Sequence, residues 1–194
     1  MLSNSADLTT ISIHDSSIRN STLTAVGPTQ VIVPPSAGGG FASVGGTYSD
    51  ITVSNVTVSS ANSEQAGAFS AKIEDGLLSN IVVTGSTVTG GDDVGGLVGK
   101  FDAGSIAQSY GTDNTVNGES KVGGLVGSVR EITVSESYVS DTSVVGTGDE
   151  IGGFIGRDEG DDGAAISYSY VSNTAVSGDD EVSGFMGSAG GANT

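Results

Sequence analysis

The stretch Val94-Gly-Gly-Leu-Val-Gly99 returns 28 residues later as Val122-Gly-Gly-Leu-Val-Gly127. Variants begin at Ile151 and Val182, and looser copies precede the first stretch. The fourth place of each copy holds a large apolar residue, and the six are Phe41, Phe69, Leu97, Leu125, Phe154 and Phe185. Six copies in so regular a register indicate a repeat protein, in which each unit buries its apolar residues against its neighbours.

Two further markers recur in each copy. The pair Ser-Tyr occurs at Ser109-Tyr110, Ser137-Tyr138 and Ser169-Tyr170, followed by segments such as Asn114-Thr-Val-Asn-Gly118. Short segments rich in β-branched residues, separated by Gly, Asp, Asn and Ser, are typical of strands joined by turns. We find no 3.6-residue apolar periodicity that would indicate a helix.

These patterns predict an all-β chain that forms a parallel β-solenoid, or β-helix. We expect about six 28-residue coils, each with three short strands, stacked about 4.8 Å apart. The six large residues should then form one internal structural ladder. In the Gly-rich strand, Val94 and Val98 face one way and Leu97 the other, so we also expect this strand to be covered on both sides.

The beginning of the chain departs from the repeat. Residues 8–14 resemble part of a repeat, but Pro28, Pro34 and Pro35 follow, and proline cannot donate a hydrogen bond to a strand ladder. We therefore expect residues 1–37 to form an irregular N-terminal coil or cap, and residues 38–194 to form the Gly-rich solenoid. The last repeat stops partway, which leaves its edge without a visible cap.

The composition excludes several classes of partner. The net charge is −17, with only six basic residues, so the surface repels nucleic acid and anionic membranes. No apolar stretch is long enough for a transmembrane helix, and without cysteine there is no disulfide or zinc–thiolate site. We therefore expect no nucleic-acid partner and no membrane insertion. The acidity suits a salt-rich medium, which favours a halophilic source.

Between Val94 and Gly187, the order Val-Gly-Gly-Leu-Val-Gly, then Ser-Tyr, then Val-x-Gly resembles the GLUG-motif repeats. Those repeats occur in large bacterial and archaeal cell-surface proteins, including adhesins. The resemblance implies a β-rich, extracellular, non-catalytic module, and it carries over no active-site residue.

The sequence offers few groups for chemistry. His14 is the only histidine and lies in the irregular first segment, so no Ser-His pair can be nominated. We expect no enzyme activity, no catalytic residue and no organic cofactor. Calcium is the one metal considered, because acidic turns precede each Gly-rich strand and calcium prefers six to eight oxygen ligands. The candidate ligands lie in the insertion at residues 157–163: Asp158, Glu159, Asp161 and Asp162. The alternative is a solvated acidic edge.

The tyrosines of the Ser-Tyr pairs should stack into a column, which would fill the core if inward or bind sugar rings if outward. We expect an extracellular structural or adhesive module of a cell-surface protein or filament. Its partners would be copies of itself or neighbouring subunits of a surface assembly, with a glycan as a further partner. The alternatives are a virion tail-fibre or spike component that binds a host surface and, more weakly, a carbohydrate-active β-helix enzyme.

Overall fold

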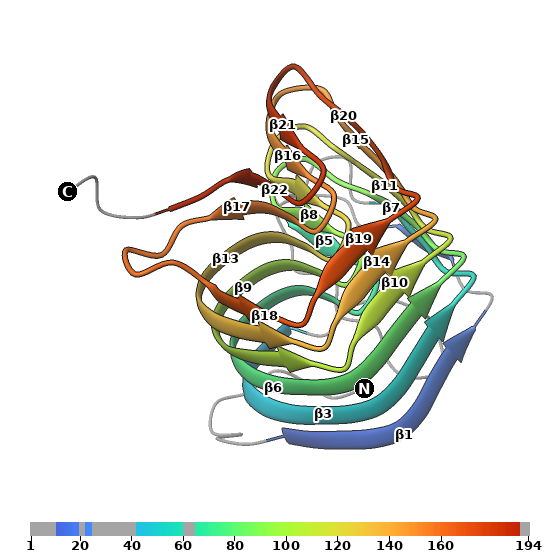
Figure 1. The fold of residues 1–194 in the computed structure, drawn as a ribbon. Helices are drawn as coiled ribbons and strands as arrows, with labels where there is room; N and C mark the ends of the chain where they lie inside the picture. The colour runs from blue at the N-terminus through green and yellow to red at the C-terminus, as the bar shows by residue number, and fades with distance from the viewer. Residues whose placement is uncertain (1–10, 20–21, 25–41, 60–64, 191–194) are drawn as a thin grey trace.

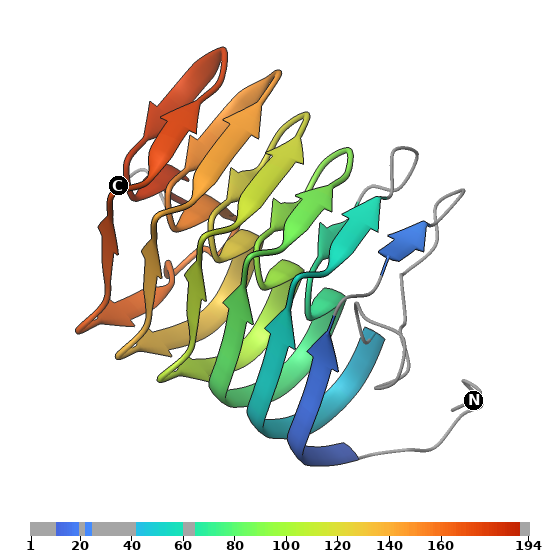
Figure 2. The same ribbon diagram turned by 90° about the vertical axis from the view of Figure 1, so that its right-hand side faces the viewer.

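The computed structural model describes residues 11–19, 22–24, 42–59 and 65–190 of the 194-residue chain. All regular structure in these ranges is β-strand, and the paired strands are parallel. Coils of about 28 residues stack into a β-solenoid of about five turns, which confirms the predicted fold class. Figures 1 and 2 show successive coils lying directly on one another.

Three parallel sheets form the walls of the solenoid. The largest has eleven strands: β1 (Ile11–Arg19), β3 (Ala42–Ser54), β6 (Ser70–Thr84), β9 (Val98–Ala107), β10 (Tyr110–Thr112), β13 (Val126–Ser135), β14 (Tyr138–Ser140), β17 (Ile155–Asp158), β18 (Ala165–Ser167), β19 (Tyr170–Ser172) and β22 (Met186–Ser188). The second has six: β2 (Thr22–Thr24), β4 (Thr57–Ser59), β7 (Thr87–Thr89), β11 (Thr115–Gly118), β15 (Ser143–Gly146) and β20 (Ala175–Ser177). The third contains the Gly-rich strands: β5 (Ala66–Gly67), β8 (Val94–Gly95), β12 (Val122–Gly123), β16 (Asp149–Gly152) and β21 (Asp180–Ser183).

The coils contain a long strand that the sequence did not indicate. Instead of three short strands, the coil that starts at β8 contains β8, β9, β10 and β11, and β9 alone is ten residues long. The 15-residue β6 bends around a corner in one piece (Figure 1). β9 contains Lys100, Asp102 and Gly104, which have low strand propensity, so its pairing with β6 and β13 holds it extended.

Alternating side chains build the core. In the second half of β6, Ile81 and Val83 point inward and are fully buried, while Val82 and Thr84 point outward and are half-buried. The same alternation places Val134, Val139 and Val144 inside a later coil. This period of two is the expected consequence of extended backbone with one face on a core.

A residue in the left-handed conformation marks each corner of the coil. At the first corner these residues are Asp50, Asn80, Gln108, Glu136 and Tyr168; at the second, Asn55, Gly85, Asp113, Asp141 and Asn173; at the third, Asp93, Lys121, Glu150 and Glu181, with φ between 48° and 66° throughout. Asn and Asp tolerate this conformation better than most residues. Many of the acidic residues in the predicted turns therefore have a local conformational role.

Polar side chains form hydrogen bonds between successive coils next to two of these corners. The Ser137 hydroxyl donates to the Ser135 carbonyl at 2.8 Å and accepts the N–H of Ser109, in the preceding coil, at 3.1 Å. Ser109 makes the same two bonds, to Ala107 and from Ile81. At the second corner, Ser86, Asn114 and Thr142 accept backbone N–H groups of the preceding coil in the same way. The serine of the Ser-Tyr pair is thus a structural residue.

The N-terminal segment adds one more rung to the solenoid. β1 pairs with β3 in parallel from Ile11 opposite Gly46 to Arg19 opposite Ser54, and β2 pairs with β4. β1 and β2 therefore stack in register with the repeats, within the segment, residues 1–37, that the sequence predicts to be an irregular coil or cap. Residues 25–41, which contain the prolines and the predicted boundary, lie outside the described ranges.

Candidate functional site

The predicted interior ladder lies in one column. Backbone N–H groups donate from Phe69 to the Leu97 carbonyl, from Leu97 to Leu125, from Leu125 to Phe154 and from Phe154 to Phe185, at 2.8–2.9 Å. The first four side chains are fully buried, Phe185 packs half-buried against the core, and the Phe154 and Phe185 rings stack at 4.8 Å. Phe41 lies outside the described residues. This column holds the coils together and offers nothing to a ligand.

The Gly-rich strand is covered on both sides by the chain itself. Val94, Leu97 and Val98 are all fully buried. A Cβ atom added to Gly95 would lie 1.9 Å from the Val98 carbonyl oxygen, and one added to Gly99 would lie 2.5 Å from that of Ala71. The glycines therefore allow close backbone packing. This strand is not available as a partner surface.

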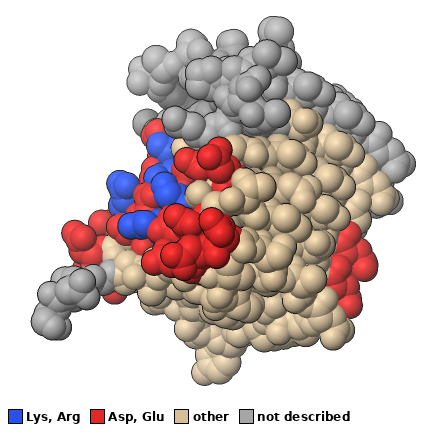
Figure 3. Space-filling view, turned by 90° about the horizontal axis from the view of Figure 1, so that it is seen from above, with Lys and Arg blue, Asp and Glu red and all other residues tan. Residues whose placement is uncertain are grey.

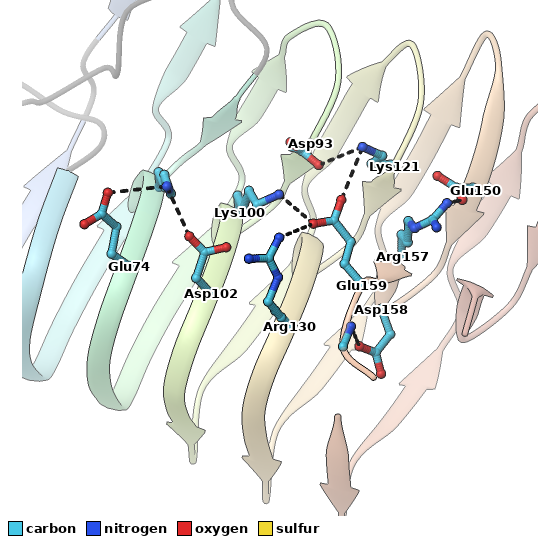
Figure 4. Close-up of polar contacts among 12 residues, drawn as sticks. Glu74, Asp93, Lys100, Asp102, Lys121, Arg130, Glu150, Arg157, Asp158 and Glu159 are labelled. Atoms are coloured by element: carbon cyan, nitrogen blue, oxygen red, sulfur yellow. Dashed lines mark hydrogen bonds and ion pairs between the residues drawn. The ribbon is translucent and has the colours of Figure 1, made fainter. Parts of the chain in front are cut away.

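A network of ion pairs crosses several coils on one face, and we call it the charged row. It contains five of the six basic residues, which are Lys72, Lys100, Lys121, Arg130 and Arg157. Figure 3 shows their blue atoms gathered in one patch beside acidic side chains, and Figure 4 shows the partners facing one another. Lys72 pairs with Asp102 at 3.1 Å, and Arg157 pairs with Glu150. The strand register causes the alignment, because Lys72 lies opposite Lys100, which lies opposite Ser128, which lies opposite Arg157.

Glu159 is the centre of the charged row. Its carboxylate lies 2.6 Å from Lys100 Nζ, 3.3 Å from Lys121 Nζ and 3.4 Å from the Arg130 guanidinium. Burial alone would raise the pKa of Glu159, but the hydrogen bonds and positive charges of Lys100 and Lys121 lower that pKa to about 2. The carboxylate is therefore charged across the physiological range and is fully engaged with cations of its own chain.

The four candidate calcium ligands are not brought together. Asp158 is buried, and its carboxylate accepts the backbone N–H groups of Gly160 and Ala164, which closes the insertion on itself. Glu159 points into the charged row, whereas Asp161 and Asp162 are exposed. Within residues 11–19, 22–24, 42–59 and 65–190, no group of three His, Cys, Asp or Glu side chains is arranged to hold a metal ion. This geometry gives the calcium hypothesis no support.

Asp93, at the third corner, is a buried carboxylate beside the charged row. Burial raises the pKa of Asp93, and the positive charges of Lys121 and Lys100 offset part of that effect. Its Oδ1 atom lies 3.9 Å from Lys121 Nζ and, like Ser128 Oγ, makes no hydrogen bond within the described ranges. Lys121 thus bridges two carboxylates in different coils, which ties the turn before β8 to the insertion.

The second surface is the outer face of β10, β14 and β19 together with the parts of β3 and β6 paired to them, and we call it the tyrosine facet. Its outward residues form two columns: Thr52, Val82, Tyr110, Tyr138 and Tyr170, and beside them Ser54, Thr84, Thr112, Ser140 and Ser172. None of the ten is charged. The tyrosine rings stack with centroids 4.6 and 5.1 Å apart and interplanar angles of 6° and 5°. The tyrosines therefore lie outside the core, with ring faces that cover one another.

Tyr168 is a feature that our sequence analysis did not single out. It occupies the first corner with φ of 50°, where other coils have Asn80, Gln108 or Glu136, and it is 87% exposed. Tyr170, two residues on, is 53% exposed. The doubled Ser-Tyr-Ser-Tyr at residues 167–170 was the available signal, because the other repeats have at most one tyrosine there.

Comparisons with protein-family models, with curated proteins and with solved structures found no match to this chain. No helix in the described ranges has the length and apolar character needed to cross a membrane. The class that the fold and surfaces define is an acidic parallel β-solenoid built from coils stacked in register. The function of this member has to be argued from its own surfaces.

Proposed function

We propose that this chain is a non-catalytic structural or adhesive module, placed outside the cell as part of a GLUG-type surface protein or filament. The observation that carries the proposal is the parallel stacking of successive coils from β1 to β22. Successive coils repeat the backbone ladder, the buried column runs from Phe69 to Phe185, and corner hydrogen bonds join several of the coils, so the coils form one stiff body. Such a body separates and presents binding groups at fixed spacing.

The side chains support the same conclusion. Acidic and basic groups of the charged row are paired with each other, and the buried hydroxyl groups of Ser109 and Ser137 are committed to the coil corners. The acidic character keeps neighbouring molecules apart except where surfaces match. These properties suit a spacer or adhesive module better than a catalyst.

The described terminal rung supports the proposed self-association. β19, β20, β21 and β22 are the last strands of their sheets, with a paired neighbour on one side only among the described residues. Val182 is 42% exposed, whereas Val94, Val122 and Ile151 at the same position of earlier coils are fully buried.

Labelling of intact source cells tests the proposed location. An antibody against this chain should label unpermeabilised cells as strongly as permeabilised cells, while an antibody against a cytosolic enzyme labels only the latter. Recovery of the chain solely in the cytosolic fraction would contradict a surface module. Recovery with purified virus particles would instead support the tail-fibre alternative, and release of reducing sugar ends from polysaccharides would support the enzyme alternative.

A further inference from the structure

We propose that the tyrosine facet docks an uncharged polysaccharide, with Tyr168 and Tyr170 packing against its sugar rings. This inference names the partner of the surface module proposed above and rests on that proposal. It is carried by three independent features of the facet: its lack of charge, its fixed row of hydroxyl groups, and a strained, exposed aromatic residue at its edge.

The charge distribution selects the partner. The ten outward residues of the facet carry no charge, in a chain with 23 acidic and six basic residues, and beyond them Arg19 of β1 lies in register with Ser54. The corners that border it carry exposed acidic residues, among them Asp113, Glu136 and Asp141. A negatively charged ligand would be repelled at both edges, whereas a neutral ligand would meet no buried, unpaired charge. The facet is therefore complementary to an uncharged, hydroxyl-rich surface.

The hydroxyl groups are already held in place. Tyr138 stacks between Tyr110 and Tyr170, so its rotation is restricted before any ligand arrives. In the adjacent column, the Ser140 hydroxyl donates to Thr112 Oγ1 at 3.1 Å. Tyr, Ser and Thr hydroxyls each donate one hydrogen bond and accept others, which matches the hydroxyl groups of a sugar. Binding to a preorganised array loses little side-chain entropy.

The aromatic edge supplies apolar contact. A left-handed backbone is costly for a bulky residue, and strained residues concentrate at functional sites. Tyr168 adopts this conformation with φ of 50° and turns its side chain into solvent, two residues before the half-exposed Tyr170. The exposed aromatic surface offers a place for the apolar C–H face of a sugar ring. The other coils place polar residues at this corner, so the aromatic pair distinguishes one position along the facet.

Binding to insoluble polysaccharides tests the proposal. The purified full chain is mixed with cellulose, chitin or curdlan particles as neutral probes and with calcium-crosslinked alginate beads as the anionic probe, and the bound fraction is measured after sedimentation. We expect binding to at least one neutral probe. The double variant Tyr168→Ala/Tyr170→Ala should lose at least about tenfold in affinity, which corresponds to about 1.4 kcal/mol.

The matched control is Leu77→Ala. Leu77 is 53% exposed, as Tyr170 is, but lies in the first half of β6, away from the facet. The Leu77→Ala variant should bind the neutral probes as the unaltered chain does. Circular dichroism and thermal melting should show that this variant and the double tyrosine variant are both folded. Absence of binding to every neutral probe, equal or stronger binding to alginate, or unchanged binding by the folded double variant would each overturn the proposal. Surface labelling without glycan binding removes only this inference, whereas glycan binding by a cytosolic chain removes the proposed location.

Discussion

The hydrogen bonds at the coil corners and the ion pairs of Glu159 in the charged row stabilise the same solenoid in different ways. The Ser137 hydroxyl makes two hydrogen bonds that Ser109 repeats in the coil before it. Glu159 instead gathers Lys100, Lys121 and Arg130 into a cluster that occurs once. The corner bonds follow from the repeat. The Glu159 cluster occurs where the repeat is interrupted, since the step from Phe154 to Phe185 is 31 residues rather than 28.

The interruption explains why a special contact is needed there. β13 pairs with both β17 and β18, so the segment between these two strands leaves the sheet and returns to it. Asp158 bonds the backbone of this segment, and Glu159 attaches it to two earlier strands. Repeated features therefore make the solenoid cohere, while unique charged features secure its irregular part.

The largest effect should come from breaking a repeated backbone approach. A Cβ atom added at Gly124 would lie 2.2 Å from the Gly153 carbonyl oxygen of the next coil. Because backbone lies on both sides, neither coil can move aside without losing ladder bonds. Gly124→Ala should lower the free energy of unfolding by about 3 kcal/mol or more, measured by chemical denaturation.

Gly184→Ala is the control for this change. Gly184 follows Gly124 and Gly153 in the same column, yet an added Cβ there would meet nothing within 4 Å. Its effect should stay within about 0.5 kcal/mol. Equal effects of the two substitutions would mean that close approach between coils is not the reason for these glycines.

A smaller effect is expected at the corner. Ser137→Ala removes the acceptor of the N–H of Ser109, a fully buried residue. An unsatisfied buried donor costs about 1–3 kcal/mol, so stability should fall by that amount. Ser143→Ala, on the outer face of β15, should change stability by less than about 0.5 kcal/mol. If Ser137→Ala proved as mild as Ser143→Ala, the corner bonds would contribute little to cohesion.

The unique cluster should show its effect through pH. The pKa of Glu159 is lowered from 4.5 to about 2, so the folded state binds this proton less readily than the unfolded state. The resulting stabilisation is complete above about pH 4.5 and is lost as the pH falls toward 2. Glu159→Gln should cost about 1 kcal/mol at neutral pH and low salt, because the site is partly exposed and solvent screens it. The difference in free energy of unfolding between the unaltered chain and the Glu159→Gln variant should shrink as the pH falls from about 4.5 toward 2, and also at high salt.

Glu131→Gln is the matched variant, since Glu131 lies exposed in β13. Denaturation of the three proteins at several pH values makes the comparison. A Glu159→Gln cost that remains constant down to pH 2 would show that packing, and not charge, gives Glu159 its effect.

The same contrast explains what could be predicted from the sequence. Leu97, Leu125 and Phe154 recur at nearly equal spacing, and equal spacing alone places them in one column of a stacked fold. The Ser-Tyr pair was visible for the same reason, although spacing could not assign the serine to the corner and the tyrosine to the outer surface. That assignment depends on which residue follows the left-handed one at each corner.

The charged row could not be predicted from the spacing of the repeats. Lys100 and Glu159 are 59 residues apart and occupy different places in their repeats. The acids of the insertion formed a cluster in sequence, which favoured a metal site. In the structure, Asp158 accepts backbone N–H groups of the insertion. Glu159 forms ion pairs with three basic side chains, because the strand register brings the few basic residues to the same face.

The smallest effect concerns the tyrosine column. Burial raises the pKa of Tyr138, and Tyr110 and Tyr170 raise it further because a phenolate at either neighbour repels a second one. In an alkaline titration followed by phenolate absorbance, the signal removed by Tyr138→Phe should belong to the late part of the curve. Tyr170→Phe should then make Tyr138 ionise at lower pH, since the repelling phenolate is gone while the stacked ring remains. Circular dichroism over the same range confirms that folded protein is titrated. If Tyr138→Phe instead removed the earliest part of the signal, the rings would not be stacked in solution, and the facet would lose the rigidity on which its proposed docking role depends.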